Sequence, residues 1–402
     1  MTQDRNLHLR RRVILLLLLV AFFATARPGF TQDEIKVLNP RTMKVSTLPA
    51  ERIPVGIAGD YKPCIAVMPD GEVLLVAFHG VKLGGTKIRE DIILYRSPDG
   101  GKTWSDPRVL DKLVGREPYL TVLKDGTIFI TVHFLPADVR NKDGFTHAYV
   151  HRSTDRGVTW TSKRIGPEGF PPKAETLLTR NVLALPDGTL LLGVDYVGGP
   201  AYLWRSTDKG VTWKPSEPLK LEGWHSEGMG SMIFGGEGVL ARSKAGKIII
   251  MARVSSEEWP IEGRKFSPTQ KWDHNDHETL WESADGGRTF RKTLDMGDYG
   301  EMYPSLLRLK DGRLLYTYTV RDLKVPLGVR AVVGRETARG LEFDFDHDVL
   351  IIDGKTPKEL PSGGGFGPTI QLKDGTLVTS YSYRAADDET HLEVARWKLQ
   401  TK

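Results

Sequence analysis

One turn signal recurs six times along the chain, and this repetition constrains the fold more than any other feature. Each copy has the form apolar-x-Asp-Gly or close to it, and a strand-like apolar run follows. The copies occupy residues 68–71, 123–126, 185–188, 243–246, 309–312 and 372–375. Asp-Gly between apolar runs predicts a tight β-hairpin, because both turn positions favour positive φ. The glycine-to-glycine spacings of 55, 62, 58, 66 and 63 residues therefore indicate six similar β units.

A second motif follows later in four of these units. It reads Ser-x-Asp-x-Gly-x-Thr-Trp, or nearly so, at residues 97–104, 153–160, 206–213 and 283–290, and residues 336–340 resemble a degraded fifth copy. The aspartate can accept turn N–H groups, the glycine supplies positive φ and the aromatic residue can pack between units. These properties predict a structural role rather than a catalytic one, and one carboxylate per copy argues against calcium binding.

The second motif matches the Asp box, and the sequence resembles the sialidase-like β-propellers over most of residues 50–402. Six units, each with two hairpins, predict an all-β fold, a six-bladed β-propeller with four-stranded antiparallel blades. Residues 34–50 are expected to supply a strand that closes the ring by pairing with residues 391–399. No long amphipathic helix is evident after the leader.

Residues 1–32 have the layout of a secretory signal peptide. Three arginines at 10–12 precede an apolar run at 13–24, and Ala24-Thr25-Ala26 offers a small-x-small cleavage pattern. We expect removal of this signal to leave a propeller of residues 33–402, exported to the periplasm or secreted. The mature chain is expected to be a monomer with no stable membrane span.

Charge and cysteine content exclude some classes of function. The leader holds five arginines and one acid, so the remainder has 51 basic and 50 acidic residues. This balance gives no global basic field and argues against nucleic acid as a partner. The single cysteine, Cys64, excludes an intramolecular disulfide, and no cofactor or metal is implied.

The hairpins also predict which residues reach one end of the central channel. Counting eight residues back from each hairpin aspartate, or from its Ala245 equivalent, gives Lys62, Glu117, Thr179, Glu237, Tyr303 and Phe366, with Tyr61, Arg116 and Arg180 adjacent. Counting seven forward from each hairpin glycine gives Phe78, His133, Asp195, Arg253, Thr319 and Ser382, with His79, Arg321 and Arg384 just beyond. So many polar side chains suit a polar pocket. A water-lined channel with internal ion pairs is the alternative.

The resemblance implies chemistry of the sialidase type. Those enzymes hold a substrate carboxylate with three arginines, and they use a tyrosine nucleophile with a glutamate partner and an aspartate acid/base. The candidate catalytic residues on this pattern are Glu237, Tyr303, Asp91 and Glu90. The candidate substrate-binding residues are Arg253, Arg116, Lys62, Tyr61, Arg180, His133 and Glu117.

The sequence also departs from the family pattern. The first-unit arginine is absent from Tyr61-Lys62-Pro63, while Arg52-Ile53-Pro54 spells the motif nine residues too early. Phe366 stands where the order of units places the tyrosine, and neither Gly328 nor Arg330 is a clean match to the third arginine.

The function expected from these features is a secreted, sialidase-like exo-glycoside hydrolase acting on a terminal, acidic sugar of a glycan. One alternative is a carbohydrate-binding propeller without catalysis, as Phe366 allows. Another is a polysaccharide lyase-like enzyme, in which His79 or His133 removes the proton α to a uronate carboxylate, an arginine neutralises that carboxylate and a tyrosine acts as the acid.

Overall fold

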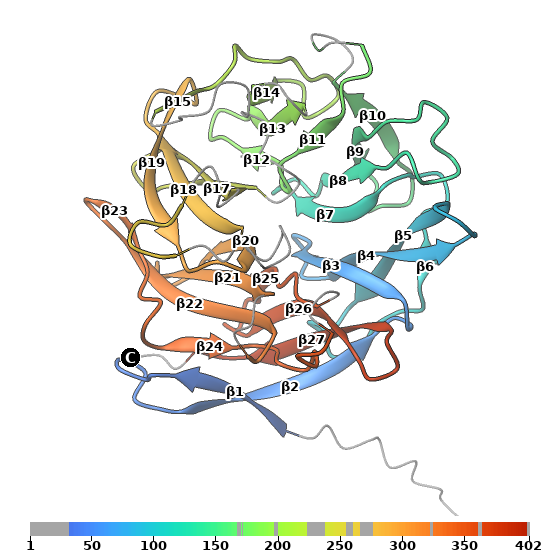
Figure 1. Ribbon diagram of the computed structural model, residues 1–402. Coiled ribbons are helices and arrows are strands. Elements are labelled where there is room, and N and C mark those ends of the chain that lie inside the picture. Colours follow the sequence, from blue (N-terminus) through green and yellow to red (C-terminus); the bar gives the residue numbers. More distant parts are fainter. Residues whose placement is uncertain are drawn as a thin grey trace, which may run out of the picture.

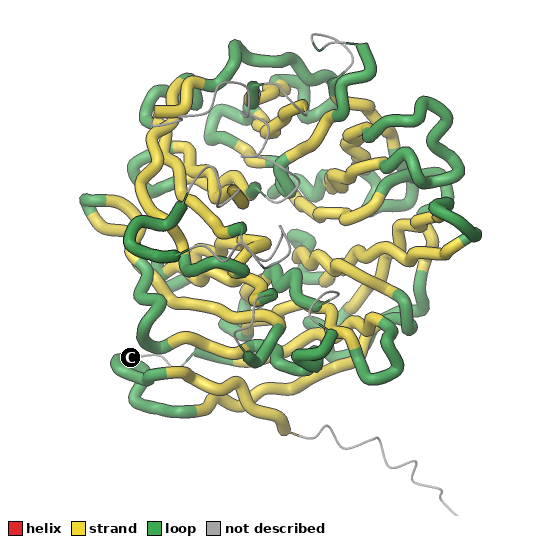
Figure 2. The backbone as a smooth tube through the Cα atoms, viewed as in Figure 1, coloured by secondary structure: helices red, strands yellow, loops and turns green. Residues whose placement is uncertain are grey.

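The protein is described by a computed structural model that covers residues 32–166, 170, 172–196, 200–222, 238–254, 260–265, 276–321, 325–360 and 364–399. These residues form strands, turns and loops, with no helix among them (Figure 2). The described residues therefore contain no helix that is long and apolar enough to cross a membrane. The signal peptide expected at residues 1–32 lies outside the described residues, apart from Gln32.

Four sheets follow one another in chain order. The first contains β3 (Asp60–Val67), β4 (Val73–Lys82), β5 (Ile88–Ser97) and β6 (Arg108–Val109), and the second β7 (Arg116–Val122), β8 (Ile128–Phe134), β9 (His147–Ser153) and β10 (Thr161–Ile165). The third contains β11 (Thr176–Leu178), β12 (Leu183–Ala184), β13 (Leu190–Tyr196) and β14 (Tyr202–Ser206). The fourth contains β15 (Lys220–Glu222), β16 (Val239–Arg242), β17 (Ile248–Val254), β18 (His277–Ser283) and β19 (Thr289–Met296).

The fifth sheet is larger and joins both ends of the chain. Its strands are β20 (Glu301–Arg308), β21 (Leu314–Val320), β22 (Gly328–Thr337), β23 (Gly340–Glu342), β24 (Val349–Ile351), β1 (Gln32–Leu38), β2 (Thr47–Val55), β27 (Thr390–Trp397), β26 (Leu377–Arg384) and β25 (Thr369–Gln371). The strand that pairs with β27 is β2, with Ala50 opposite Trp397 and Val55 opposite Leu392. The strand that closes the ring therefore covers Thr47–Val55, later in the sequence than the expected residues 34–50. The preceding strand, β1, pairs with β2 on one side and with β24 on the other.

The sheets are arranged around a ring in chain order (Figure 1). The ring closes where β3, from the first sheet, lies against β26 and β27 near the C-terminus. The innermost strands also contact one another, as β3 of the first sheet does with β7 of the second, and as β20 does with β25 at the opposite end of the largest sheet. Side chains on these innermost strands are therefore brought together although they lie far apart in sequence.

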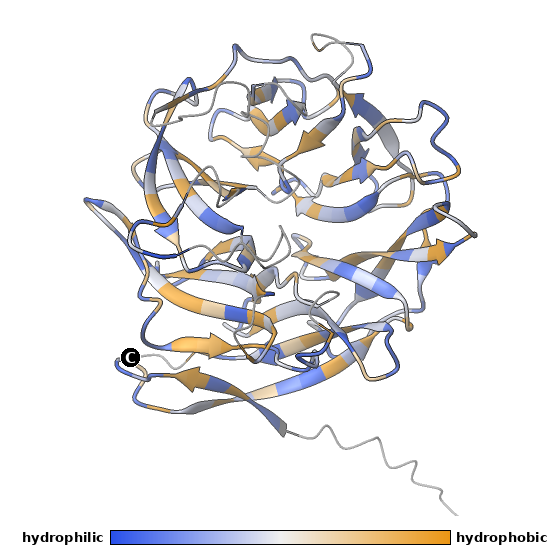
Figure 3. Cartoon of the chain, in the orientation of Figure 1, coloured by the Kyte–Doolittle hydropathy of each residue, from blue (hydrophilic) through white to orange (hydrophobic). Residues whose placement is uncertain are grey.

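Six apolar clusters fill the spaces between consecutive groups of strands, and in Figure 3 the strands carry most of the hydrophobic colour. On β4, Leu74 and Val76 pack toward the second sheet, whereas Leu75 and Ala77 pack toward the C-terminal strands. This alternation is the period of two that a strand imposes. Both faces of each sheet are buried, so the fold depends on every sheet having two neighbours.

All six predicted hairpins form, with a turn type that differs from the expected one. In each, the glycine N–H donates to the carbonyl three residues earlier, at 2.9 Å for Gly71 and 3.1 Å for Gly246. Only the glycines have positive φ, for example 102° at Gly71, and the preceding aspartates do not. This is a type I turn followed by a left-handed glycine. Since the aspartate position needs no positive φ, Ala245 can replace it.

The second repeated motif forms a closed turn around its aspartate. In the first copy Thr103 donates its N–H to Asp99 Oδ1 at 2.9 Å and its hydroxyl to Oδ2 at 2.7 Å, and Gly101 N–H donates to Ser97 Oγ at 2.7 Å. The copies at Asp155, Asp208 and Asp285 repeat these bonds. Each carboxylate accepts hydrogen bonds from its own turn, which supports a structural role.

We predict that Asp99→Ala lowers the free energy of unfolding by about 1–2 kcal/mol, because the turn N–H groups lose an ionised acceptor. Partial burial acts to raise the pKa of Asp99, but the hydrogen bonds from Thr103 and Ser97 outweigh it and lower the pKa. The stabilisation is therefore present above the unfolded pKa of about 3.9 and is lost in acid. Chemical denaturation at pH 7 measures it, with the exposed Asp106→Ala as control. Equal unfolding free energies for the two variants would contradict the structural role.

Candidate functional site

A β-bulge interrupts the innermost strand in three of the repeated units, at the position that the hairpin spacing selects. The register shifts lie in β3, β7 and β20, around Lys62, Glu117 and Tyr303. These residues have φ of 49°, 54° and 63°, and Phe366 in a fourth unit has φ of 64°. Such values are uncommon for residues other than glycine and cost of order 1–3 kcal/mol each. Four units thus hold the same strained conformation at equivalent positions.

The bulges bring neighbouring side chains to the same place. In a regular strand, successive side chains point to opposite faces. Here Arg116 Nε lies 3.5 Å from Oε1 of the adjacent Glu117, and Lys62 Nζ lies 5.7 Å from the ring centroid of the adjacent Tyr61. The bulges at Lys62 and Glu117 therefore each contribute two side chains to one cluster.

Aromatic rings form the base of this cluster. The ring centroids of Tyr303 and Phe366 are 4.1 Å apart, and Tyr61 meets Phe366 edge-on at 5.4 Å. Tyr61 also packs against Phe78, its partner across β3 and β4, at 5.6 Å. The rings come from three of the repeated units, so they line the inner ends of the sheets.

Four cationic side chains lie over these rings. Lys62 Nζ is 4.3 Å from the centroid of Phe366, and the guanidinium carbons of Arg180 and Arg321 are 5.4 and 4.6 Å from that of Tyr303. The fourth, Arg116, lies over Phe78 at 5.3 Å. Each distance is within the range of a cation–π interaction. We call these four residues and their aromatic base the cationic cluster.

Glu117 is the acid at the centre of the cationic cluster. Its Oε1 lies 2.5 Å from Lys62 Nζ and 3.5 Å from Arg116 Nε, and its Oε2 lies 3.5 Å from Arg180. Burial alone would raise the pKa of Glu117, but these three positive charges hold it well below its usual range. Glu117 is therefore ionised at neutral pH.

Lys62 is the cation whose charge depends most on pH. Burial, together with the neighbouring guanidinium groups, lowers its pKa to about 7, although Glu117 acts in the opposite direction. Lys62 can therefore lose its proton close to neutral pH, whereas the arginines stay charged.

The two neighbouring acid/base candidates, Glu90 and Asp91, are placed differently. Glu90 is buried, and its Oε1 lies 3.5 Å from Arg116 Nε; burial raises its pKa. Asp91 instead accepts hydrogen bonds from Arg89 and Arg140, each at 3.1 Å. The structure therefore brings Glu90 to the cationic cluster and engages Asp91 in a separate ion-pair network.

Two further predicted residues complete the cluster. His133 is the strand partner of Arg116 across β7 and β8, and burial lowers its pKa to about 4, so its imidazole is neutral at pH 7. The hydroxyl of Tyr61 accepts a hydrogen bond from Arg321 at 2.9 Å, and burial raises the pKa of Tyr61. The site thus contains a neutral base and a neutral phenol.

The structure brings together most of the predicted site residues, namely Lys62, Glu117, Tyr303, Tyr61, Arg116, Arg180, His133 and Glu90. Arg253 lies on β17, where its Nε donates to Asp276 at 2.6 Å. Glu237 lies outside the described residues. Arg321 was not among the predicted site residues, although it stands two positions beyond Thr319, which the hairpin spacing selects. His79 is hydrogen-bonded to Asp60, with 2.9 Å between Nδ1 and Oδ1.

Comparison with known proteins places the chain in a family. Residues 56–316 match the model of the BNR repeat-like domain. The chain belongs to this family. No curated protein sequence matches the chain significantly.

Solved structures resemble this BNR repeat-like protein in fold. A protein of unknown function from Dyadobacter fermentans is 20% identical with a TM-score of 0.63, and the match covers 93% of this chain and 100% of that one. A sialidase from Streptococcus pneumoniae is 14% identical, with a TM-score of 0.60 and coverage of 86% and 70%. The intramolecular trans-sialidase from Ruminococcus gnavus is also 14% identical, with a TM-score of 0.56 and coverage of 85% and 96%. Together with the family match, these likenesses show a sialidase-like fold.

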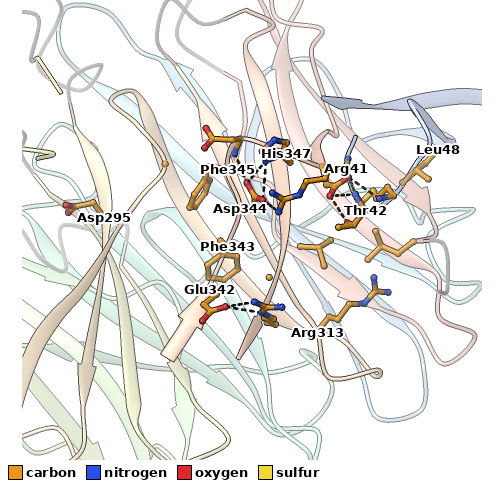
Figure 4. A pocket seen from close by; sticks show the side chains of 18 of the residues that line it. Arg41, Thr42, Leu48, Asp295, Arg313, Glu342, Phe343, Asp344, Phe345 and His347 are labelled. Carbon is orange, nitrogen blue, oxygen red and sulfur yellow. Dashed lines mark hydrogen bonds and ion pairs between the residues drawn. The ribbon is translucent and has the colours of Figure 1, made fainter. Parts of the chain in front are cut away.

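A cavity of about 710 Å³ in this BNR repeat-like protein lies away from the cationic cluster, beside residues 41–48 and 342–348 (Figure 4). Its charged groups pair with one another at partly exposed positions, as Arg41 does with Asp344 and Arg335 with Glu342. Surface pairs of this kind contribute little to the stability of the fold. Among the described residues, no group of His, Cys, Asp and Glu is arranged to hold a metal ion.

We predict that one lysine of the folded protein titrates near pH 7 and that Lys62→Arg removes this titration. The folded pKa lies below the ordinary value of 10.5, so the unfolded chain binds more protons between these values. Through this group, the free energy of unfolding therefore rises as the pH increases from about 7 to about 10. NMR of the lysine ε-carbons measures the titration. If every lysine titrated near pH 10, the desolvated lysine described above would be wrong.

Proposed function

We propose that this protein is an exo-acting glycoside hydrolase whose substrate carries a terminal, acidic sugar. The observation that supports the proposal is the cationic cluster, in which Lys62, Arg116, Arg180 and Arg321 lie over an aromatic base. Guanidinium groups suit carboxylates, and aromatic rings suit the apolar face of a sugar. The Arg116 side chain is 26% exposed, compared with 8% for Lys62 and 7% for Arg180. We therefore expect the ligand to approach along Arg116.

Glu90 is the proposed general acid. A general acid must be protonated near the working pH, and the burial that raises the pKa of Glu90 favours that form. Its carboxyl group lies beside Arg116, on the side from which the ligand is expected. The proton would pass from Glu90 to the glycosidic oxygen as the bond to the sugar breaks.

Tyr303 is the proposed nucleophile: its oxygen would bond to the anomeric carbon as the glycosidic bond breaks, and water would then cleave the bond between Tyr303 and the sugar. A glutamate partner would take the phenol proton, and the sequence offers Glu237 for that role.

The ring of Tyr303 lies below Lys62, Arg180 and Arg321, whose charges favour a developing phenolate. Glu117 is a poorer nucleophile although it is ionised, because three cations already neutralise its charge. A neutral phenol also avoids repulsion with an anionic substrate.

We predict that Glu90→Gln lowers kcat at least 100-fold toward an acidic glycoside, since proton transfer by a positioned side chain contributes about 10²–10⁴-fold. The matched variant Asp91→Asn is expected to lose less than tenfold, because Asp91 is engaged by Arg89 and Arg140. Fluorogenic glucuronides, their neutral glucosides and sialosides provide the assay. We expect faster turnover of an acidic glycoside than of its neutral match, and poor turnover of simple α-sialosides, since Tyr61 stands where the family has an arginine.

Two results would reject this proposal. One is full activity of Glu90→Gln, and the other is saturable binding of acidic saccharides by the wild type without any turnover. The second result would identify a binding protein, in line with the phenylalanine at position 366.

His133 supports a second candidate, a lyase acting on a uronate-containing polysaccharide. Its imidazole is buried and neutral at pH 7, it is the strand partner of Arg116, and the Tyr61 hydroxyl belongs to the same cluster. His133 would take the proton α to the carboxylate, and Tyr61 would protonate the leaving oxygen. An unsaturated product that absorbs in the ultraviolet, lost in His133→Ala, would select the lyase over the hydrolase.

We also propose that the two halves of the largest sheet act as separate blades, which gives a six-bladed propeller. The six apolar clusters, each between consecutive groups of strands, support this count. We further propose that the protein is exported, that residues 1–32 are removed, and that the mature protein is a monomer. N-terminal sequencing and the mass of the exported protein in solution test these proposals; an intact N-terminus or a stable dimer would reject them.

A further inference from the structure

Glu117 occupies the point on which the cations of the cluster converge. Both of its carboxylate oxygens face positive charge, Oε1 toward Lys62 and Arg116 and Oε2 toward Arg180. The three cations come from three different units of the ring. This is the arrangement that a carboxylate ligand would require, yet a residue of the chain already fills it.

The backbone presents Glu117 in this position. The bulge on β7 and the left-handed φ of 54° place Glu117 on the same side as the adjacent Arg116. The side chain is largely buried, with 15% of it exposed, and it remains ionised because its pKa is held well below the usual range. The cluster thus contains its own counter-ion.

We propose that Glu117 is an internal competitor for the acidic group of the ligand and thereby determines the specificity of the site. This inference rests on the proposed function, since it requires an acidic sugar at the cationic cluster. The ligand carboxylate would displace Glu117 from Lys62 and Arg180 and take its place. A small anion gains little from this exchange, because it replaces one carboxylate by another. An acidic sugar can gain, in addition, the contact of its ring with Tyr61, the partly exposed ring beside Tyr303 and Phe366.

Replacing Glu117 by glutamine tests the competition directly. Glutamine keeps the shape of the side chain and removes its charge, so the cations become available to a ligand. We expect Glu117→Gln to bind D-glucuronate at least tenfold more tightly than the wild type, with D-glucose binding unchanged. The control is Glu393→Gln, which removes another buried carboxylate. Glu393 accepts a hydrogen bond from Lys355 Nζ at 2.7 Å, away from the cationic cluster. This variant should bind glucuronate as the wild type does. Unchanged or weaker binding of glucuronate by Glu117→Gln would overturn the inference.

Chemical rescue of Glu117→Ala provides a second readout that needs no turnover. Removal of the carboxylate takes a shared counter-ion from Lys62, Arg116 and Arg180, of which Arg116 keeps Glu90 as a neighbour, so the melting temperature should fall. Millimolar acetate should restore part of the loss, whereas acetamide, its neutral match, should not. If Glu117→Ala folds only in acetate, the refolding yield reports the same rescue. Equal effects of acetate and acetamide would overturn the inference. Absence of hydrolysis by the wild type would reject the proposed function, but it would not change the expected rescue by acetate.

Discussion

The site depends on a backbone constraint that is repeated around the ring. At Lys62, Glu117, Tyr303 and Phe366 the chain adopts a left-handed conformation that L-amino acids with side chains avoid. Strain of this kind persists only where the surrounding structure determines it. Here it is held by paired strands on one side of each position and by the apolar clusters between sheets. The scaffold therefore holds four residues in an unfavourable backbone conformation at one end of the ring.

This arrangement places positive charges where water is scarce, which is unfavourable unless the charges are balanced. The cationic cluster balances them in two ways. The aromatic base attracts the cations through its ring faces, and Glu117 supplies a negative charge in contact with Lys62, Arg116 and Arg180. The pKa of Lys62 near 7 shows that the balance is incomplete, since burial and the neighbouring guanidinium groups still disfavour its proton. An acidic ligand would relieve this remaining excess of charge.

Much of the fold and part of the site could be predicted from the sequence, because repeats carry spatial information. The hairpin spacing placed Lys62, Glu117, Tyr303 and Phe366 at equivalent positions, and the ring geometry brings them together. The turn type was wrong because Asp-Gly fits both a two-residue turn and a type I turn with a left-handed glycine. The bridging role of β1, the pairing of Asp91 with Arg140 and the pairing of Arg253 with Asp276 depend on contacts distant in sequence, which no local pattern encodes. Arg321 was expected near the end of the channel but was not chosen as a site residue, because strand spacing alone does not show that its side chain lies over Tyr303.

The central claim is that equivalent bulges build one site for an acidic sugar, and a crystal structure of the protein with D-glucuronate tests it most directly. The account predicts that the sugar ring lies against Tyr61, with its carboxylate among Lys62, Arg116 and Arg180 and with Glu117 displaced. Positive φ at the four equivalent positions should be visible in the same map. Glucuronate bound elsewhere, with Glu117 still held by the three cations and the cluster free of ligand, would contradict the account.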